Sequence, residues 1–378
     1  MKLQRKSGLR ALAVGAAAVS GALVLTACGS DNNSTTAAPS GGSSSTAAAS
    51  GITCGPKANL LASGSTAQQN AVNVWVKNYM QACSGSEINY KGTGSGAGVT
   101  DFLNGTTAFA GSDSALKPAE ITQSKKVCAG GQGIDLPMAP GPIAIGYNVP
   151  GVSNLVLDAD TLAKIFNGRI THWNDPAIAK LNPSAKLPST PIQTFHRSDA
   201  SGTTDNFTKY LIGAAGTDWP YSGGKAWQAK GGQSATGSAG VAAQVKQTAG
   251  SIGYFELSYA TSQSISTAQL NTGAAQPVTV SSDSASKDVA AAQVVGTGGD
   301  LALKLDYATK ADGAWPITLV TYEIVCDKGN KAATLPATKA FLNYIAGTQG
   351  QGALTALGYA PLPDAIATKV RAAISSLS

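Results

Sequence analysis

The sequence predicts an α/β fold of two lobes with mainly parallel sheets. From about residue 57, short apolar segments typical of strands alternate with segments that have helical spacing. The chain has 378 residues, which is more than one hydrophobic core usually serves. Its hydrophobic content is 43% and its charged content 13%, so we expect buried cores and exclude a disordered chain.

The N-terminus has the pattern of a secretory signal over residues 1–27. Four basic residues precede an apolar run at 11–25, which is too short and too rich in Ala and Gly for a good membrane-spanning helix. The run ends in Leu-Thr-Ala-Cys, which resembles the bacterial lipobox and implies that Cys28 is lipidated and becomes the new N-terminus. An ordinary signal peptide with a coincidental cysteine is the alternative.

Residues 28–51 are expected to form a flexible tether, because Ser, Thr, Ala, Gly and Asn predominate and cannot build a core. Its mean reach is roughly 25 Å. The formal net charge of the whole chain is +6. Without the four basic residues of the signal, 23 basic residues face 21 acidic ones. A nearly neutral mature chain argues against a nucleic-acid-binding surface.

The remaining elements follow in chain order. Apolar residues at helical spacing predict a helix at 66–82, and Asp160 is expected to cap a helix at 161–167. Pro140-Gly141-Pro142 is expected to separate two extended segments, and 213–250 is expected to form surface loops and short helices. The other expected strands are 59–62, 87–91, 108–111, 134–138, 142–147, 191–196, 251–255 and 316–325, and the other helices 97–103, 202–212, 337–345 and 364–376.

Four cysteines remain once Cys28 is set aside: Cys54, Cys83, Cys128 and Cys326. An even number in a secreted chain predicts two disulfides, and three pairings are possible. We favour Cys54–Cys83 and Cys128–Cys326, because Cys54 and Cys83 each precede a predicted strand and would share a sheet edge if those strands are parallel neighbours. Four free thiols are the alternative. The spacing and the two histidines do not suit a metal site.

Three loops that lead into predicted helices carry candidate anion donors, at residues 64–66, 92–98 and 196–203. Helix N-termini present unpaired N–H groups, and glycine allows close approach to the backbone. Ser and Thr hydroxyls add neutral donors, and Arg197 adds a permanently charged fork. Each loop alone is compatible with an ordinary helix cap or turn. Together they indicate a site for a small, multiply charged anion.

A fourth segment, residues 111–114, supplies the carboxylate of Asp113. An acid that faces a bound anion repels it unless a proton lies between them. Phosphate keeps a proton at neutral pH, whereas sulfate does not. A turn-capping role for Asp113 is the alternative interpretation.

These segments, with residues 162–176, resemble the phosphate-binding lipoprotein of the bacterial phosphate-specific ABC transport system, a type II periplasmic binding protein. The segments occur in the family's order, from about residue 55 to the end. The resemblance implies a two-lobed periplasmic-binding-protein type II fold with a hinge. It also implies phosphate ligands, with Asp199 holding the guanidinium of Arg197: Thr66, Ala67, Ser95, Asp113, Arg197, Ser201, Gly202 and Thr203.

One departure from the family pattern is visible. Many relatives have an aromatic residue and a proline after the threonine, where this chain has Ala67 and Gln68. A backbone donor survives that change.

The expected lobes are 52–140 with 322–378, and 141–321, and the two crossovers near 140–146 and 315–322 form the hinge. The expected function is selective phosphate capture outside the cytoplasmic membrane and delivery to the permease subunits of an ABC importer, by a membrane-anchored monomer without cofactor or metal. A binding protein for another oxyanion such as sulfate is the alternative. An enzyme is not expected, because no nucleophile elbow or phosphate-binding P-loop motif occurs. A structural or adhesive surface protein would not need the donor cluster at 197–203.

Overall fold

The computed structural model describes residues 51–378, so the predicted signal peptide, Cys28 and all of the tether except Gly51 lie outside the described residues. The strands are β1 Asn59–Gly64, β2 Glu87–Gly92, β3 Phe109–Ser112, β4 Gly133–Asn148, β5 Val156–Leu157, β6 Gln193–Arg197, β7 Gln233–Ala235, β8 Ser251–Glu256, β9 Ser266–Thr267, β10 Gln269–Leu270, β11 Gln293–Val294, β12 Leu303–Lys304 and β13 Thr318–Cys326.

The α-helices are α1 Gln69–Ala82, α2 Ser95–Leu103, α3 Pro118–Ser124, α4 Ala159–Phe166, α5 Pro176–Leu181, α6 Gly202–Ala215, α7 Gly237–Gln247, α8 Leu257–Gln263, α9 Ser282–Ala290, α10 Leu335–Ile345, α11 Thr348–Gly352 and α12 Asp364–Ser376, and short 3₁₀ turns lie at Gly216–Asp218 and Thr355–Leu357. No helix among residues 51–378 is both long enough and apolar enough to cross a bilayer.

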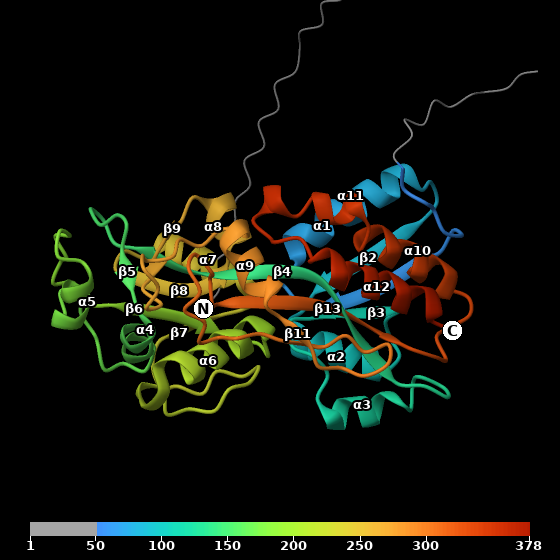
Figure 1. The fold of residues 1–378 in the computed structure, drawn as a ribbon, viewed down its shortest axis with the longest axis horizontal. Helices are drawn as coiled ribbons and strands as arrows, with labels where there is room; N and C mark the ends of the chain where they lie inside the picture. The colour runs from blue at the N-terminus through green and yellow to red at the C-terminus, as the bar shows by residue number, and fades with distance from the viewer. Residues whose placement is uncertain (1–50) are drawn as a thin grey trace, which may run out of the picture. The chain divides into compact units, whose positions relative to one another are not determined.

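One nine-stranded sheet organises the fold, in the order β2-β1-β3-β13-β4-β8-β6-β7, with β9 paired to β4 (Figure 1). At one end β1 lies parallel to β2 and β3, and at the other end β6 lies parallel to β7 and β8. Within this sheet the antiparallel pairs all involve β4 or β13, which cross between the two ends; β11 and β12 form a separate antiparallel pair. The predicted α/β fold class is confirmed, with parallel strands in both halves of the sheet.

Strands β4 and β13 pair from Gly133 and Cys326 to Pro142 and Thr318, and the predicted lobe boundaries fall inside them. The expected break at Pro140-Gly141-Pro142 is wrong, because β4 runs through it as one 16-residue strand. Proline cannot donate to a ladder and is tolerated near bulges. The register shifts between Thr321 and Tyr322, beside these prolines, which is where such a bulge is needed.

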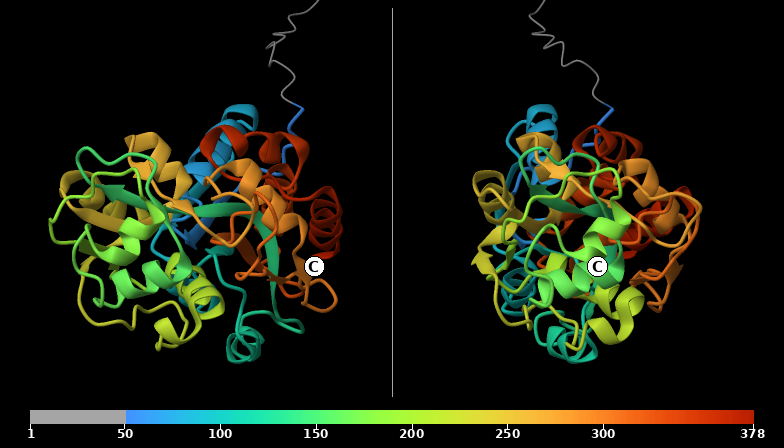
Figure 2. Two further views of the ribbon diagram at one scale, coloured as in Figure 1. Left: turned by 60° about the vertical axis from the view of Figure 1, so that its left-hand side comes forward. Right: turned by 90° about the vertical axis from the view of Figure 1, so that its left-hand side faces the viewer.

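Two main cores flank the crossing strands. One gathers side chains from α1, α10 and α12, and the other gathers side chains from α4, α6, α7 and β8. In both views of Figure 2 the N-terminal elements, in blue, lie beside the C-terminal helices, in red, which agrees with the contacts of α1 with α10. Ala67, which precedes α1, packs into the second core, so the loop after β1 touches both halves.

The helix starts differ from expectation in two places. α1 begins at Gln69, three residues later than predicted, which leaves Thr66 in a loop. The cap of α4 is Asp158, because its extended backbone lets its carboxylate accept from the N–H of Thr161; the prediction of Asp160 is wrong, since Asp160 already lies in the first turn.

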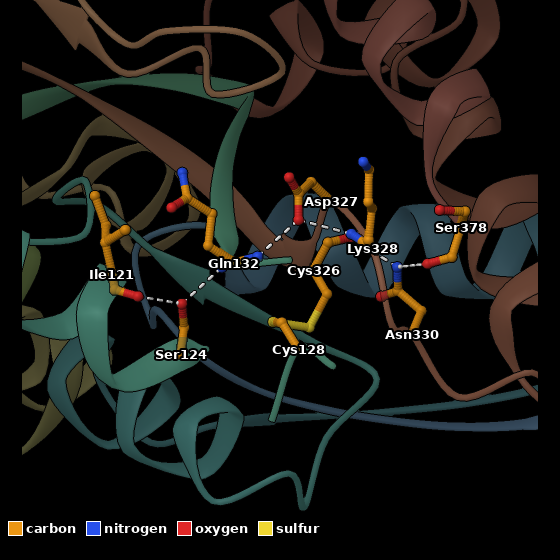
Figure 3. The surroundings of a disulfide bond; sticks show 10 residues. Ile121, Ser124, Cys128, Gln132, Cys326, Asp327, Lys328, Asn330 and Ser378 are labelled. Carbon is orange, nitrogen blue, oxygen red and sulfur yellow. Dashed lines mark hydrogen bonds between the residues drawn. A yellow bond between two sulfur atoms is a disulfide. The ribbon is translucent and has the colours of Figure 1, made fainter. Parts of the chain in front are cut away.

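Both favoured disulfides are present. Cys54–Cys83 joins the segments that precede the parallel neighbours β1 and β2, with Cα atoms 5.4 Å apart. Cys128–Cys326 joins the chain after α3 to the end of β13, with Cα atoms 5.3 Å apart (Figure 3). The predicted pairing is therefore confirmed.

Candidate functional site

Asp113 lies at the centre of the predicted donor loops, directly after β3, and only 3% of its surface is exposed. Its Oδ1 atom accepts from the hydroxyls of Ser65 and Thr321, and its Oδ2 atom accepts from the hydroxyl of Ser95 at 2.9 Å. A carboxylate offers about four acceptor positions. Three protein hydroxyls thus leave about one position for a ligand proton.

Burial raises the pKa of the Asp113 carboxyl. Hydrogen bonds from Ser65, Thr321 and Ser95 and the charge of Arg197 act in the opposite direction. The group that should accept a ligand proton is thus buried and positioned by its neighbours.

Ser95 joins the two halves of the molecule. Its Oγ atom accepts from the N–H of Asp113 at 3.1 Å and from the N–H of Gly202 at 3.2 Å. Gly202 opens α6 and has no space for a side chain, because a Cβ atom there would lie 2.5 Å from the Cβ of Asp113 and 2.7 Å from Ser95 Oγ. Glycine is needed here for close approach of two elements.

Arg197 ends β6 and is 2% exposed. Its Nε and Nη2 atoms donate to Asp199, and its Nη1 atom donates to Thr203 Oγ1 at 3.2 Å and Ser238 Oγ at 3.0 Å. Burial acts to raise the pKa of Asp199, but the bonds and charge of Arg197 lower it on balance. Burial likewise opposes the charge on Arg197, and Asp199 keeps its pKa raised. The guanidinium is therefore a fixed buried cation.

Glu256 is a second buried carboxyl beside this cation, at the end of β8. Its Oε1 atom accepts from Thr203 Oγ1 at 2.6 Å, and its Oε2 atom has no hydrogen-bond partner within the described chain. Burial raises its pKa; the hydroxyls of Ser238 and Thr203 lower it, the charge of Asp113 raises it, and the charge of Arg197 lowers it.

Thr66 reaches the Arg197 cluster through Ser238. Its Oγ1 atom lies 3.2 Å from Ser238 Oγ and accepts from the N–H of Ser238 at 3.1 Å. The N–H of Ala67 turns inward and donates to Ser65 Oγ at 3.0 Å. Ser201 caps α6 by accepting from the N–H of Thr204 at 3.2 Å.

The structure thus brings most of the predicted residues into two adjoining clusters. One cluster contains Ser95, Asp113 and Gly202, and the other contains Arg197, Asp199 and Thr203, with Thr66 attached through Ser238. The helix starts of α2, α6 and α7 lie at these clusters, which concentrates N–H donors there. Ala67 and Ser201 lie beside the clusters with their polar groups paired inside the protein.

Four neighbours were missed from the sequence: Ser65, Ser238, Glu256 and Thr321. Ser238 lies in the segment 213–250, which was expected to form surface loops and short helices, and it belongs to the 11-residue helix α7 within that segment. Glu256 had a detectable signal, because it directly follows the apolar strand predicted at 251–255 and is the last residue of β8. Ser65 lies inside a loop that was recognised, and Thr321 lies on a crossing strand that was interpreted only as a connection.

Comparison with known proteins places the chain in a family. A family model described as a PBP superfamily domain matches residues 33–349. Phosphate-binding protein PstS 3 of Mycobacterium leprae is 44% identical over 363 residues, which cover 95% of this chain and 96% of that protein. Phosphate-binding protein PstS of Xylella fastidiosa is 34% identical over 305 residues, or 80% of each chain.

Solved structures share the fold. The high-affinity periplasmic phosphate-binding protein PfluDING, solved with bound phosphate, aligns with a TM-score of 0.70 at 22% identity and covers 83% of this chain and 93% of its own. A phosphate-binding protein from Stenotrophomonas maltophilia aligns with a TM-score of 0.65 at 20% identity and the same coverage.

The fold and the family model define a protein of the PBP superfamily. Within that superfamily, the chain belongs to the PstS phosphate-binding protein family. The resemblance inferred from the sequence is confirmed.

Proposed function

We propose that this protein binds inorganic phosphate between its two lobes and delivers it to the permease subunits of a phosphate ABC importer. The observation that carries the proposal is the juxtaposition of Asp113, a buried acceptor, with hydroxyls and helix N-termini and with the buried cation of Arg197. The relatives at 34–44% identity are named phosphate-binding proteins.

The proposed ligand contacts follow from this arrangement. Arg197, with Asp199 behind it, supplies a permanent charge, and Thr66 and Ser95 supply hydroxyls. The backbone of Ala67 and the start of α6 at Ser201, Gly202 and Thr203 are the proposed N–H donors. In the described conformation the N–H groups of Ala67, Ser201 and Gly202 donate to Ser65 Oγ, the carbonyl of Lys225 and Ser95 Oγ, so a bound ligand would have to replace these partners. Asp113 accepts the proton that hydrogen phosphate retains.

We propose lobes of 52–140 with 322–378, and 141–321, hinged where β4 and β13 pair. Direct hydrogen bonds already link the two lobes, as between Ser95 and Gly202. The described conformation therefore has the contacts of a closed state, and a ligand that touches both lobes would favour it.

We propose an extracytoplasmic location, with a lipid on Cys28 and residues 28–51 as the tether, and a monomeric state. The role is binding rather than catalysis, since the named relatives are binding proteins. A preference for sulfate or another oxyanion is not favoured, because Asp113 would face an unprotonated ligand oxygen.

Isothermal titration calorimetry of the mature protein with phosphate, sulfate, molybdate and arsenate tests the function. We expect saturable binding of phosphate, and of its protonated analogue arsenate, at a stoichiometry of about one, without measurable sulfate binding. Equal affinities for phosphate and sulfate, or no phosphate binding, would contradict the proposal.

A further inference from the structure

Three buried oxygen atoms without hydrogen-bond partners lie behind the site. Both carboxylate oxygens of Glu323 and the Oε1 atom of Gln68 have none among the described residues. Glu323 is 1% exposed and Gln68 is fully buried. All three atoms are acceptors unless a carboxyl proton is present, and buried polar groups in proteins are almost always paired.

The strand register places these groups next to one another. Glu323 on β13 is paired with Gly111 on β3. A Cβ atom on Gly111 would lie 2.3 Å from Gln68 Nε2 and 2.4 Å from Tyr90 Oη. The amide of Gln68 and the hydroxyl of Tyr90 therefore occupy the space left by the glycine, beside Glu323.

Hydrogen bonds fix which end of the Gln68 amide remains available. Its Nε2 atom donates to Tyr90 Oη at 3.1 Å, and the Tyr90 hydroxyl donates to the carbonyl of Ser65 at 2.8 Å. If the amide were turned over, Gln68 Oε1 would face Tyr90 Oη, whose only hydrogen is already donated to Ser65, and two acceptors would meet. The Oε1 atom is thus the end that needs a donor.

We infer that Glu323 is a positioning residue of the binding site, which carries a proton, donates it to Gln68 Oε1 and so holds the loop of residues 65–68 in its binding geometry. The path is continuous, because Gln68 holds Tyr90, Tyr90 holds Ser65, and Ser65 donates to Asp113. This inference rests on the proposed function, since the loop matters for phosphate only if the site binds it.

The electrostatic surroundings support a neutral Glu323. Burial raises its pKa to about 8; the neighbouring amide of Gln68 acts to lower it, and the charge of Asp113 acts to raise it. Tyr90 faces it from β2 and stays neutral, because burial raises its own pKa well above the usual value. The paired residues on the adjoining strands, Gly111 and Leu136, carry no charge.

Ionisation of Glu323 removes the donor and sets a negative charge behind Asp113 and the bound anion. Phosphate affinity should therefore fall as the pH rises through about 8. Glu323→Gln offers an N–H donor to Gln68 at every pH, so this loss should disappear in the variant. Glu87→Gln, at an exposed carboxylate on β2, is the matched control.

The experiment measures the phosphate Kd by calorimetry from pH 6.5 to 9.5 for the wild type and both variants. The ratio of wild-type to Glu323→Gln Kd cancels the ionisation of phosphate itself. We expect this ratio to rise roughly tenfold or more between pH 7 and 9.5, because a required proton costs up to about tenfold in affinity per pH unit above its pKa. The ratio of wild-type to Glu87→Gln Kd should not change with pH. A flat ratio for Glu323→Gln would overturn the inference.

Unfolding in urea gives a second readout that needs no ligand. The folded pKa of Glu323 lies above its ordinary value of 4.5, so its contribution to stability is complete below that value and is lost as the pH rises through about 8. Between pH 4.5 and about 8, the unfolding constant of the wild type should rise by up to about tenfold per pH unit relative to the unfolding constant of Glu323→Gln. If the unfolding constants of the wild type and Glu323→Gln had the same pH dependence, Glu323 would be charged in the folded protein and the inference would be wrong. If the two unfolding constants differed in their pH dependence but the protein did not bind phosphate at pH 7, only the proposed function would be contradicted, and Glu323 would still carry a proton in the fold.

Discussion

The hydroxyl of Tyr259 donates a 2.7 Å hydrogen bond to the main-chain carbonyl of Thr66. The next carbonyl, that of Ala67, accepts from Tyr359 at 2.6 Å, and the preceding one, that of Ser65, accepts from Tyr90. Three consecutive peptide groups of the loop after β1 are thus oriented by three tyrosines. Tyr259 alone comes from the proposed second lobe, on α8, so its bond forms only when the lobes are together.

We expect Tyr259→Phe to weaken phosphate binding by about 3–10-fold, since one neutral hydrogen bond contributes about 0.5–1.5 kcal/mol. The effect should be mostly in the dissociation rate, because the lost bond stabilises the closed state. Stopped-flow measurement of phosphate release tests this. Tyr221→Phe, which contacts Trp219 away from the site, is the control. An unchanged release rate in Tyr259→Phe would contradict this role of Tyr259.

Replacement of Arg197 should affect binding more strongly. Arg197→Ala removes a buried cation and leaves Asp199 unpaired, so we expect a loss of about 2–5 kcal/mol in binding free energy. Arg197→Lys should restore only part of it, because a single ammonium cannot contact Asp199, Thr203 and Ser238 in the same geometry. Calorimetry measures both variants, with the exposed Arg169→Ala as the control. If Arg197→Ala lost less than tenfold in phosphate affinity, the charge of Arg197 would not contribute to phosphate binding.

The disulfides should stabilise the fold without shaping the site. Reduction should lower the melting temperature, since each bond typically contributes about 2–4 kcal/mol. The Cys128–Cys326 bond closes a separation of 198 residues and Cys54–Cys83 one of 29, so the chain-entropy model predicts the larger loss for the Cys128→Ser/Cys326→Ser variant.

Differential scanning calorimetry of the two double variants, with phosphate titration of each at 20 °C, tests both statements. Full-strength phosphate binding and a lowered melting temperature are expected. Weakened binding by a folded double variant would show that the disulfides also position the donor loops.

The sequence predicted the periodic elements better than the site. Helix α12 was predicted at its observed bounds, because Asp364 begins a regular apolar stripe. The expected break in β4 was wrong because a bulge formed with a distant strand decides how prolines are tolerated there. Thr321 lies 208 residues from Asp113, to which it donates, and no local pattern encodes such a contact. The loops rich in glycine, serine and threonine could be recognised from the sequence as sources of hydrogen-bond donors. The hydrogen bonds that these loops form with one another inside the protein could not be predicted.

Cys28→Ala tests the proposed anchor. The variant should be released from the membrane while its phosphate affinity stays unchanged, because the residues of the candidate site all lie between Ser65 and Thr321. Cell fractionation with immunoblotting measures the distribution, and calorimetry of the released protein measures the affinity. A variant that remains in the membrane fraction would place the anchor elsewhere.

The selectivity of the site should depend on Asp113. Its carboxylate already accepts from three hydroxyls, so the remaining acceptor position is suited to a ligand O–H. Hydrogen phosphate offers that proton, whereas sulfate presents only another lone pair. In a closed site, two facing acceptors leave both unpaired and add repulsion between like charges. Sites built to pair a ligand hydroxyl reject analogues without one by about 10⁴–10⁵-fold.

Asp113→Asn removes this charge and adds an N–H₂ donor that can turn toward the ligand. We therefore expect sulfate binding to appear, while phosphate loses comparatively little, because the amide carbonyl can still accept its proton. Competition between phosphate and sulfate at neutral pH measures the change, with Asp364→Asn at the exposed start of α12 as the control. If Asp113→Asn folds, binds phosphate and still ignores millimolar sulfate, Asp113 is not the discriminating group, and its hydrogen bonds to Ser65, Ser95 and Thr321 would mark it as a structural residue of the turn.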